Sequence, residues 1–382
     1  MEKILHDLQK RKNENLYRVN EIVDAHATPY ITIDNVRYIN FSSNDYLGLA
    51  NDPQVVSSFV DAGKQYGVGS GAAHLVTGHH RLHHALEESI AQFTNRSRAL
   101  LFSSGYMANI GLLQALCGPK SVIFADKLNH ASLIDGAKLS GAKLKRYAHS
   151  DMDRLESFLC QSNSAEKYIV SDGVFSMDGD TAKLKDILYL SKKYHANVII
   201  DDAHGFGVLG ENGRGICELH AAEADDSPIL MGTLGKAFGT FGAFVVGSDV
   251  LIDWLIQSAR SYVYTTAMPP AIAAASLQSL QIIHTQKQRR QHLHKLIVLF
   301  RSLASHAGLS IMPSETAIQP IIVGDEKHAL EGSAKLRKSG FLVKAIRPPT
   351  VPKGTSRLRV TLSAKHSEQH ITDLVAGLRE LL

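Results

Sequence analysis

The sequence predicts an α/β protein built around a large, mostly parallel sheet. From about residue 50 onward, helical patterns alternate with short apolar or β-branched runs. Such alternation is typical of right-handed βαβ units that bury a parallel sheet between helices. Strands and helices then intermix on a smaller scale toward the C-terminal end. We therefore expect an N-terminal segment (1–45), a large domain (46–285) and a small α+β domain (286–382).

The N-terminal segment is expected to begin with an amphipathic helix and to continue with two short strands. The helix is predicted by an apolar stripe formed by Ile4, Leu5, Leu8 and Leu16. The strands are expected at 30–33 and 37–40, joined by a turn at Asp34-Asn35.

The elements of the two domains follow from the same periodicities. In the large domain we expect helices at 53–66, 80–94, 106–116, 131–140, 151–160 and 183–194. The strands are expected at 99–102, 121–124, 168–171, 197–200, 228–231 and 243–246. A long helical stretch at 270–307 leads to the small domain, with strands at 318–323, 341–345 and 357–362 and helices at 326–339 and 367–381.

Composition narrows the class of protein. Apolar residues make up 44% and charged residues 20% of the 382 residues, as in soluble globular proteins. No apolar run reaches the length of a membrane span, and the first residues do not form a signal peptide. The three cysteines are scattered, which favours a reducing cytoplasm, and the net charge of +4 includes no basic block that would bind nucleic acid.

A histidine cluster raises the question of a metal site. His79, His80, His83 and His84 would form two i,i+4 pairs on a helix, a spacing that can hold a metal. However, the segment lacks the glutamate of a His-Glu-x-x-His helix, and no cysteine lies nearby. We therefore expect no functional metal site.

The most informative motif is a lysine among small residues, Gly232-Thr233-Leu234-Gly235-Lys236-Ala237-Phe238-Gly239. A lysine that must hold an aldehyde covalently needs open space and low polarity around its amine. About 35 residues upstream, Asp201 follows the apolar run 198–200. An acid at the end of a buried strand, combined with such a lysine, suits a pyridoxal phosphate site. There the acid keeps the pyridine nitrogen protonated.

Other polar loops follow predicted strands in the same way. Ser104, Gly105 and Tyr106 open a helix, and helix N-termini bind phosphate. His130 could stack on a flat ring, and Ser176 is expected to face the same site. In open α/β sheets the carboxyl ends of the strands are where ligands bind. The glycines at 67–72 do not predict dinucleotide binding, because a helical pattern rather than a strand precedes them.

With these motifs, the chain resembles the α-oxoamine synthases, a family of fold-type I pyridoxal phosphate enzymes. The resemblance runs from 41–49 to Arg357-Leu358-Arg359, and the run 345–352 is typical of the branch that acts in biotin biosynthesis. It implies a large, mostly parallel seven-stranded sheet flanked by helices, in a homodimer with active sites at the interface. The implied reaction is a decarboxylative condensation of L-alanine with a pimeloyl thioester, carried by coenzyme A or acyl carrier protein. The alternatives are another α-oxoamine synthase, such as glycine C-acetyltransferase, or an aminotransferase.

The resemblance also implies residue roles. The catalytic residues would be Lys236, Asp201, His204 and His130. The cofactor would further contact Ser104, Gly105, Tyr106, Ser176 and Thr233, while Thr265 and Thr266 would reach across the dimer interface. The substrates would contact Arg18, Asn44, His130, Thr350 and Arg359, and a guanidinium such as that of Arg359 binds a carboxylate in a bidentate fork.

Overall fold

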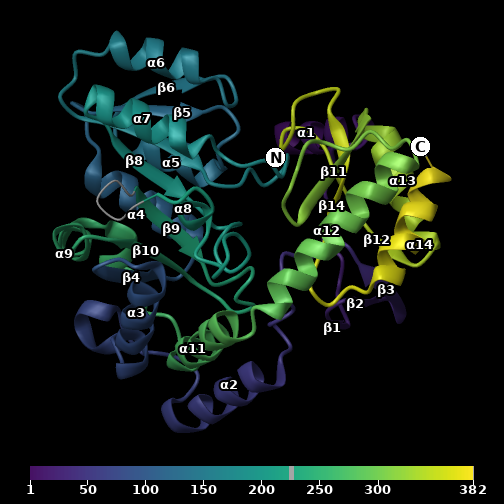
Figure 1. Ribbon diagram of the computed structural model, residues 1–382, viewed down its shortest axis with the longest axis horizontal. Helices are drawn as coiled ribbons and strands as arrows, with labels where there is room; N and C mark the ends of the chain where they lie inside the picture. Colours follow the sequence, from purple (N-terminus) through teal and green to yellow (C-terminus); the bar gives the residue numbers. More distant parts are fainter. Residues whose placement is uncertain (223–227, 382) are drawn as a thin grey trace. The chain divides into compact units, whose positions relative to one another are not determined.

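A computed structural model describes residues 1–222 and 228–381 of the chain (Figure 1). The chain divides into two compact units. The large unit comprises residues 49–176 and 181–288. The small unit comprises residues 1–48, 177–180 and 289–382, so both ends of the sequence contribute to it.

The large unit is built on a seven-stranded sheet in the order β4-β10-β9-β8-β7-β5-β6. The strands are β4 (Arg98–Phe102), β5 (Val122–Asp126), β6 (Lys143–Tyr147), β7 (Lys167–Asp172), β8 (Asn197–Asp201), β9 (Ile229–Thr233) and β10 (Ala243–Gly247). Strands β6, β5, β7, β8 and β9 run parallel, while β10 pairs antiparallel with β9 and with β4. The α/β fold class predicted from the sequence is therefore confirmed.

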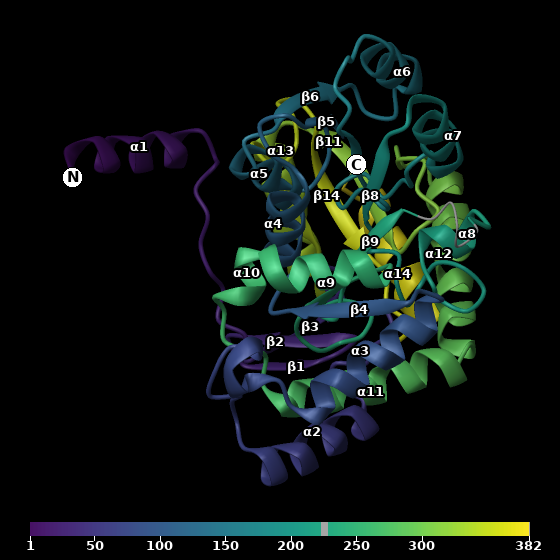
Figure 2. The ribbon, with the colours of Figure 1, turned by 90° about the vertical axis from the view of Figure 1, so that its left-hand side faces the viewer.

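Helices flank this sheet on both faces. The helices of the large unit are α2 (Pro53–Tyr66), α3 (Arg81–Thr94), α4 (Gly105–Leu116), α5 (Ala131–Leu139), α6 (Met152–Cys160), α7 (Leu184–Tyr194), α8 (Ile216–Leu219), α9 (Asp249–Ser258), α10 (Arg260–Val263) and α11 (Pro270–Thr285). Of these, α2 packs against α11. Figure 2 shows α4, α5, α9 and α10 together in front of the sheet, and α4 contacts each of the other three. Side chains between these helices and the sheet, such as Ile123, Leu112 and Leu133, are completely or almost completely buried. Burial of each one stabilises the fold by about 1.5–3 kcal/mol.

Some elements of the large unit differ from the sequence expectation. Strand β6 was not expected, because lysine and arginine occupy much of it and only Tyr147 is buried. The π-helix η1 (His74–Gly78) and helices α8, α9 and α10 were also not expected. The expected helical stretch at 270–307 is present, but it is divided into two helices by a break between Thr285 and Gln288.

The small unit contains two sheets. The first has the order β1-β2-β3-β12 and comprises β1 (Ala25–Ala27), β2 (Tyr30–Ile33), β3 (Val36–Asn40) and β12 (Phe341–Leu342). The second has the order β11-β14-β13 and comprises β11 (Ile318–Gly324), β13 (Lys344–Ile346) and β14 (Ser356–Thr361). Its helices are α1 (Glu2–Asn13), α12 (Gln288–His306), α13 (Glu326–Lys338) and α14 (Glu368–Arg379).

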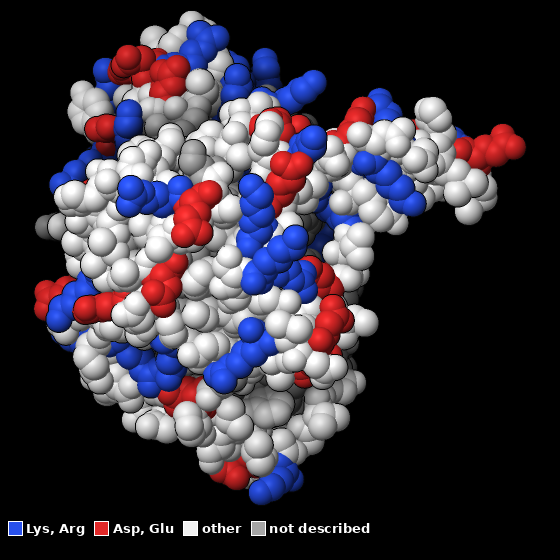
Figure 3. Space-filling view, turned by 90° about the vertical axis from the view of Figure 1, so that its right-hand side faces the viewer, with Lys and Arg blue, Asp and Glu red and all other residues white. Residues whose placement is uncertain are grey.

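The helix and the two strands expected at the N-terminal end are present, and strand β1 precedes the two strands in the sheet although it was not expected. The turn between β2 and β3 has positive φ angles at Asp34 and Asn35, as a two-residue hairpin turn requires. Helix α1 ends at Asn13, so Leu16 lies outside it, and none of its residues is buried. No helix among the described residues is long and apolar enough to cross a membrane. Figure 3 shows basic and acidic side chains interspersed on one face of the molecule.

Candidate active site

A cavity of about 190 Å³ lies at the carboxyl ends of strands β5, β7, β8 and β9. It is lined by Gly105, Tyr106, His130, Ser132, Asp172, Val174, Ser176, Asp201, Ala203, His204, Met231, Thr233 and Lys236. Eight of the residues singled out from the sequence therefore share one cavity within the large unit. The parallel strands explain this, because their carboxyl ends meet at the same edge of the sheet.

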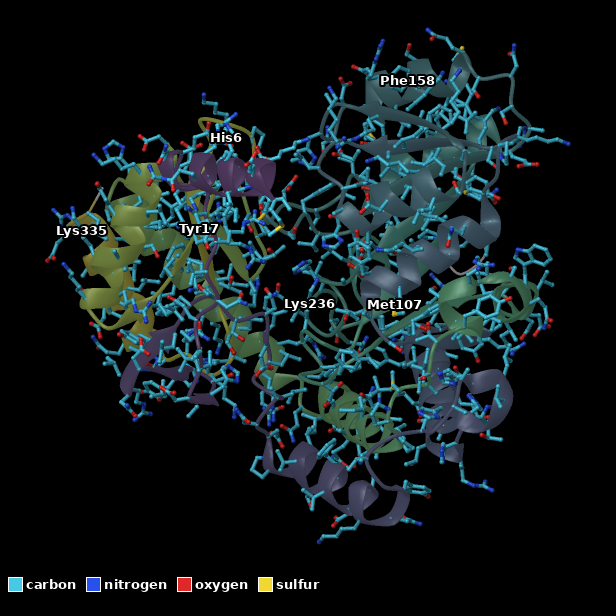
Figure 4. The ribbon with its side chains drawn as sticks, turned by 180° about the vertical axis from the view of Figure 1, so that it is seen from behind. His6, Tyr17, Met107, Phe158, Lys236 and Lys335 are labelled. Atoms are coloured by element: carbon cyan, nitrogen blue, oxygen red, sulfur yellow. The ribbon has the colours of Figure 1, made fainter. Side chains whose placement is uncertain are left out.

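Lys236, labelled in Figure 4, lies in the loop after β9. Its amine contacts His204. The distance between Lys236 Nζ and His204 Nε2 is 2.8 Å. The hydroxyl of Thr233 fixes the start of this loop, because it accepts from Gly235 N (3.2 Å) and donates to Gly242 O (3.0 Å). Gly239 ends the turn with φ +69°, and a Cβ at this position would lie 2.3 Å from Ala50 N. The glycine thus permits a close backbone contact that positions the lysine loop.

Asp201 ends strand β8, and its buried carboxylate accepts two hydrogen bonds. Ala203 N donates to one oxygen (3.0 Å), and Asn109 Nδ2 donates to the other (2.7 Å). The same Asn109 nitrogen donates to Ser132 Oγ (2.8 Å), which lies 2.7 Å from His130 Nδ1. A continuous network therefore joins Asp201 to His130. The sequence assigned no role to Asn109 or Ser132, which follow Tyr106 and His130 by three and two residues.

His130 presents a neutral ring to the cavity. It is the N-cap of α5, and its Nδ1 accepts from Ser132 N (3.3 Å). Burial lowers the pKa of His130, and the nearby Lys236 acts in the same direction against the carboxylate of Asp201. An uncharged imidazole can lie against a flat ring without repelling a protonated heterocycle.

Two further buried carboxyl groups surround Asp201. Asp172 is its register partner on β7, and its carboxylate accepts from His130 N at 3.0 and 3.2 Å. Burial raises the pKa of Asp172 well above its ordinary value, and the charge of Asp201 adds to this effect. Burial likewise raises the pKa of Asp202, which accepts from Ile216 N. Asp172 and Asp202 therefore both favour the protonated form more than an exposed aspartate does.

The N-terminus of α4 forms another wall of the cavity. Ser104 is the N-cap, and its hydroxyl accepts from Met107 N (3.3 Å). Gly105 and Tyr106 supply the first N–H groups of the helix, which have no carbonyl partner within it. These groups and the helix dipole form a site for an anionic group.

The candidate substrate residues form two clusters within the small unit. Arg359, on β14, is only 7% exposed, and its guanidinium donates to Asn44 Oδ1 (3.4 Å) and Thr361 Oγ1 (2.9 Å). Arg18 Nη2 donates to Thr350 Oγ1 (3.0 Å), so these two residues also lie together. Arg357 is committed elsewhere, because it pairs with Asp178 and donates to Met177 O.

Thr265 and Thr266 lie beyond α10 and do not line the cavity described above. Thr266 forms an antiparallel bridge with Ala73, and Ala267 N donates to Ala72 O (3.0 Å). Residues 72–73, just before η1, are therefore paired with residues 266–267, which we call the threonine segment.

Comparison with known proteins identifies the family. Residues 36–378 match the family model of aminotransferase class I and II. The chain belongs to this family. It is 52% identical over 378 residues to 8-amino-7-oxononanoate synthase of Saccharophagus degradans, which covers 98% of this chain and 95% of that protein. The corresponding enzyme of Cellvibrio japonicus is 50% identical over 98% of this chain and 94% of that protein. These relatives confirm the resemblance inferred from the sequence motifs.

Solved structures of other enzymes share the fold. Serine palmitoyltransferase of Sphingomonas wittichii superimposes with a TM-score of 0.93 at 29% identity and covers 99% of this chain and 96% of that one. The 8-amino-7-oxononanoate synthase of Francisella tularensis superimposes with a TM-score of 0.79 at 32% identity. The match covers 90% of this chain and 97% of that one. The fold is thus common to enzymes with different names, whereas the curated relatives at about half identity carry one name.

Proposed function

We propose that this chain condenses L-alanine with a pimeloyl thioester and releases carbon dioxide and the thiol, forming 8-amino-7-oxononanoate for biotin biosynthesis. The observation that carries the proposal is that Lys236 and the buried Asp201 line one cavity. The sequence identity to 8-amino-7-oxononanoate synthases selects this reaction among those of the fold.

The residues of the cavity fit pyridoxal phosphate as the cofactor. Lys236 supplies an amine for its aldehyde, and Asp201 supplies a carboxylate for its ring nitrogen. Asp201 accepts one hydrogen bond on each oxygen, which leaves lone pairs for a further donor. The N-terminus of α4 and Thr233 would hold the phosphate, and Ser176 would lie beside the ring.

Bound in this cavity, pyridoxal phosphate supplies an electron sink for negative charge at the α-carbon of alanine. Asp201 would hold a proton on the pyridine nitrogen of the cofactor. Lys236 removes the α-proton of alanine and later returns a proton, while the contact of its amine with His204 Nε2 at 2.8 Å orients it. His130 is held by Ser132 and Asp172, so it can cover the ring as a fixed neutral plane.

The small unit supplies the residues that would bind the substrates. Arg359 is prevented from rotating by Asn44 and Thr361, and it would bind the carboxylate of alanine through its planar fork. Arg18 and Thr350 would contact the acyl substrate. We expect the acyl carrier to be coenzyme A or acyl carrier protein, and the protein to act in the cytoplasm.

Carbon dioxide release from purified protein tests the function. Alanine, glycine and serine are each combined with pimeloyl-coenzyme A, pimeloyl-acyl carrier protein, acetyl-coenzyme A and palmitoyl-coenzyme A. We expect release with alanine and a pimeloyl donor. Because the fold also matches serine palmitoyltransferase, preference for serine and the palmitoyl donor would favour that reaction instead. Preference for glycine and the acetyl donor would indicate a glycine C-acetyltransferase.

A homodimer completes the proposal, with Thr265 and Thr266 of one protomer reaching the phosphate in its partner. A complementation experiment tests this arrangement. Alone, the Lys236→Ala variant should be inactive and the Thr266→Val variant should be weakened. In a heterodimer of the two, one site combines the unchanged Lys236 of one protomer with the unchanged Thr266 of the other, so the mixture should regain activity. Absence of recovery in a mixture that forms heterodimers would contradict the shared site.

A further inference from the structure

A second cluster of polar side chains lies in the large unit around the start of α3. It consists of His79, His84 and Glu87, whose potential ligand atoms all lie within 4.8 Å of one another. None of the three lines the cavity that contains Lys236. We propose that these side chains bind one divalent transition-metal ion, with zinc as the best match.

The three side chains offer two imidazoles and one carboxylate, a ligand set that zinc accepts with a water molecule in the fourth position. His79 Nε2 lies 3.8 Å from Glu87 Oε2. Ligand atoms around a tetrahedral zinc ion lie roughly 3.3–3.6 Å apart, so a small closure of the two side chains completes the geometry. His84 and Glu87 are one turn apart on α3, which places both side chains on the same face.

Glu87 is an acidic residue in a largely buried position. Its side chain is only 12% exposed, and Leu101 N donates to its Oε1 (3.0 Å). Its Oε2 lies 3.8 Å from His79 Nε2, beyond hydrogen-bond distance. Buried carboxylates are normally paired or bound to a metal, and this oxygen is directed toward the imidazoles.

Contacts outside the cluster hold two ligands in the orientation that a metal requires. His79 Nδ1 lies 2.9 Å from His74 Nδ1, so one nitrogen of His79 is engaged and Nε2 is left for the metal. The Leu101 N–H fixes Glu87 through the oxygen that does not face His79. Metal ligands are typically oriented by such hydrogen bonds on their far side.

The neighbouring histidines have other tasks. His83 Nδ1 accepts from His80 N (2.9 Å), and His83 Nε2 lies 2.7 Å from Met268 O, so both of its nitrogens are engaged. His74 stacks on Tyr262 with ring centroids 5.0 Å apart. These contacts distinguish the proposed ligands from the two histidines beside them.

The metal would join η1 to α3. The segment before η1 pairs with the threonine segment through Ala72 and Ala73, and Ser70 Oγ donates to Met268 O (2.5 Å). A metal bound by His79 and Glu87 would therefore restrain residues 70–79 and, through them, residues 266–268. The expected consequence is slower amide hydrogen exchange in both segments when zinc is bound.

Metal titration of the full-length holoenzyme, purified without a histidine tag, tests the proposal. We expect one equivalent of Zn²⁺ by calorimetry, and one equivalent of Co²⁺ with the intense visible absorption of a four-coordinate site. His84→Gln and Glu87→Gln should each weaken zinc binding tenfold or more. Glu88→Gln is the matched control, because Glu88 is exposed and lies 3.3 Å from His84 Nε2 but outside the proposed ligand set. The Glu88→Gln variant should bind zinc with the same affinity as the unmodified chain.

The proposal is overturned if the unmodified chain binds no zinc, if His84→Gln binds it normally, or if Glu88→Gln loses as much affinity as Glu87→Gln. Should Glu87→Gln fail to fold, the comparison of His84→Gln with Glu88→Gln decides alone, since both side chains are mostly exposed. Zinc binding without slower exchange at 70–79 and 266–268 would overturn the restraining role.

Discussion

Asp172 and Asp201 are register partners at the carboxyl ends of the adjacent parallel strands β7 and β8, and both carboxyl groups are buried. They differ in their hydrogen bonds. Asp201 accepts from the side chain of Asn109 and the backbone of Ala203, whereas Asp172 accepts from the backbone of His130. Because two buried negative charges repel, the pair favours one ionised and one neutral carboxyl.

Asp201→Asn should retain the cofactor but lose most of its turnover. The amide has nearly the same shape but cannot keep a proton on the ring nitrogen, so stabilisation of the developing charge is lost. We expect a decrease in kcat of about 10²–10³-fold, measured by carbon dioxide release. Asp186→Asn, an exposed change on α7, is the control and should be unaffected. Unchanged turnover in the Asp201 variant would contradict the role assigned to this carboxylate.

Asn109→Ala should weaken both the fold and cofactor binding. The substitution removes the donor shared by Asp201 and Ser132, which leaves buried acceptors without this partner. The free energy of unfolding should fall by about 1–3 kcal/mol, as measured by urea denaturation. Asn163→Ala, at an exposed position, should change it little. Equal effects of the two substitutions would show that the Asn109 network does not stabilise the site.

Asp172→Asn should change how stability depends on pH. Burial and the charge of Asp201 raise the pKa of Asp172 well above its ordinary value of 3.8, so the folded chain binds a proton that the unfolded chain releases. The contribution of this group to the free energy of unfolding is therefore fully present at pH values below its ordinary pKa. It is lost as the pH rises through the pKa of the folded chain. The variant cannot ionise here, so its free energy of unfolding should fall less with rising pH.

Urea denaturation of the cofactor-free chain at several pH values, from about 4 to 8, measures this difference. Asp186→Asn serves again as the control, because its carboxyl group is exposed. Parallel pH profiles for the Asp172 variant and the unmodified chain would show that Asp172 is ionised in the fold.

Arg359→Lys should raise the KM for alanine while leaving cofactor absorbance unchanged. Lysine cannot reproduce the planar fork that Asn44 and Thr361 hold in place. Loss of a charged hydrogen bond is worth about 1.5–3 kcal/mol, so we expect KM to rise roughly 10- to 150-fold. Arg357→Lys is the matched control on the same strand. It should lower stability through its lost contact with Met177 O, without a selective change in the KM for alanine.

Gly239→Ala should destabilise the large unit far more than Gly235→Ala. A Cβ at position 239 would lie 2.3 Å from Ala50 N on a backbone with φ +69°, whereas the nearest atom at position 235 is 3.6 Å away. We expect a loss of about 2 kcal/mol or more for the first change and less than about 1 kcal/mol for the second. Thermal unfolding of both variants makes the comparison, and similar melting temperatures would contradict it.

The sequence was sufficient to predict the α/β sheet and eight of the thirteen residues that line the cavity. Apolar runs locate most strands, and Asp201, His130 and Ser176 follow such runs. Strand β6 was missed because it lies at the edge of the sheet and its charged side chains suppress the apolar signal. Residues at strand ends could thus be found without coordinates, because the parallel topology brings these ends together.

Contacts that depend on the packing of different elements could not be predicted in this way. Asn109 lies on α4 and reaches both Asp201 on β8 and Ser132 on α5, and no spacing in the sequence encodes that meeting. The approach of His74 to His79 similarly depends on η1, which has no periodic signature. The roles of Arg18, Thr350, Thr265 and Thr266 stay predictions.

The strand order has a consequence for how the chain acquires its cofactor. Neighbours β4 and β10 are separated by more than a hundred residues in sequence, and β8 and β9 each follow long connections. Contacts between such distant segments form late, because closing the intervening loops is entropically costly. Asp201 and Lys236 therefore become neighbours only once the centre of the sheet has assembled. During refolding, the yellow colour of captured vitamin B6 should emerge after helical circular dichroism has recovered, and would report completion of the sheet.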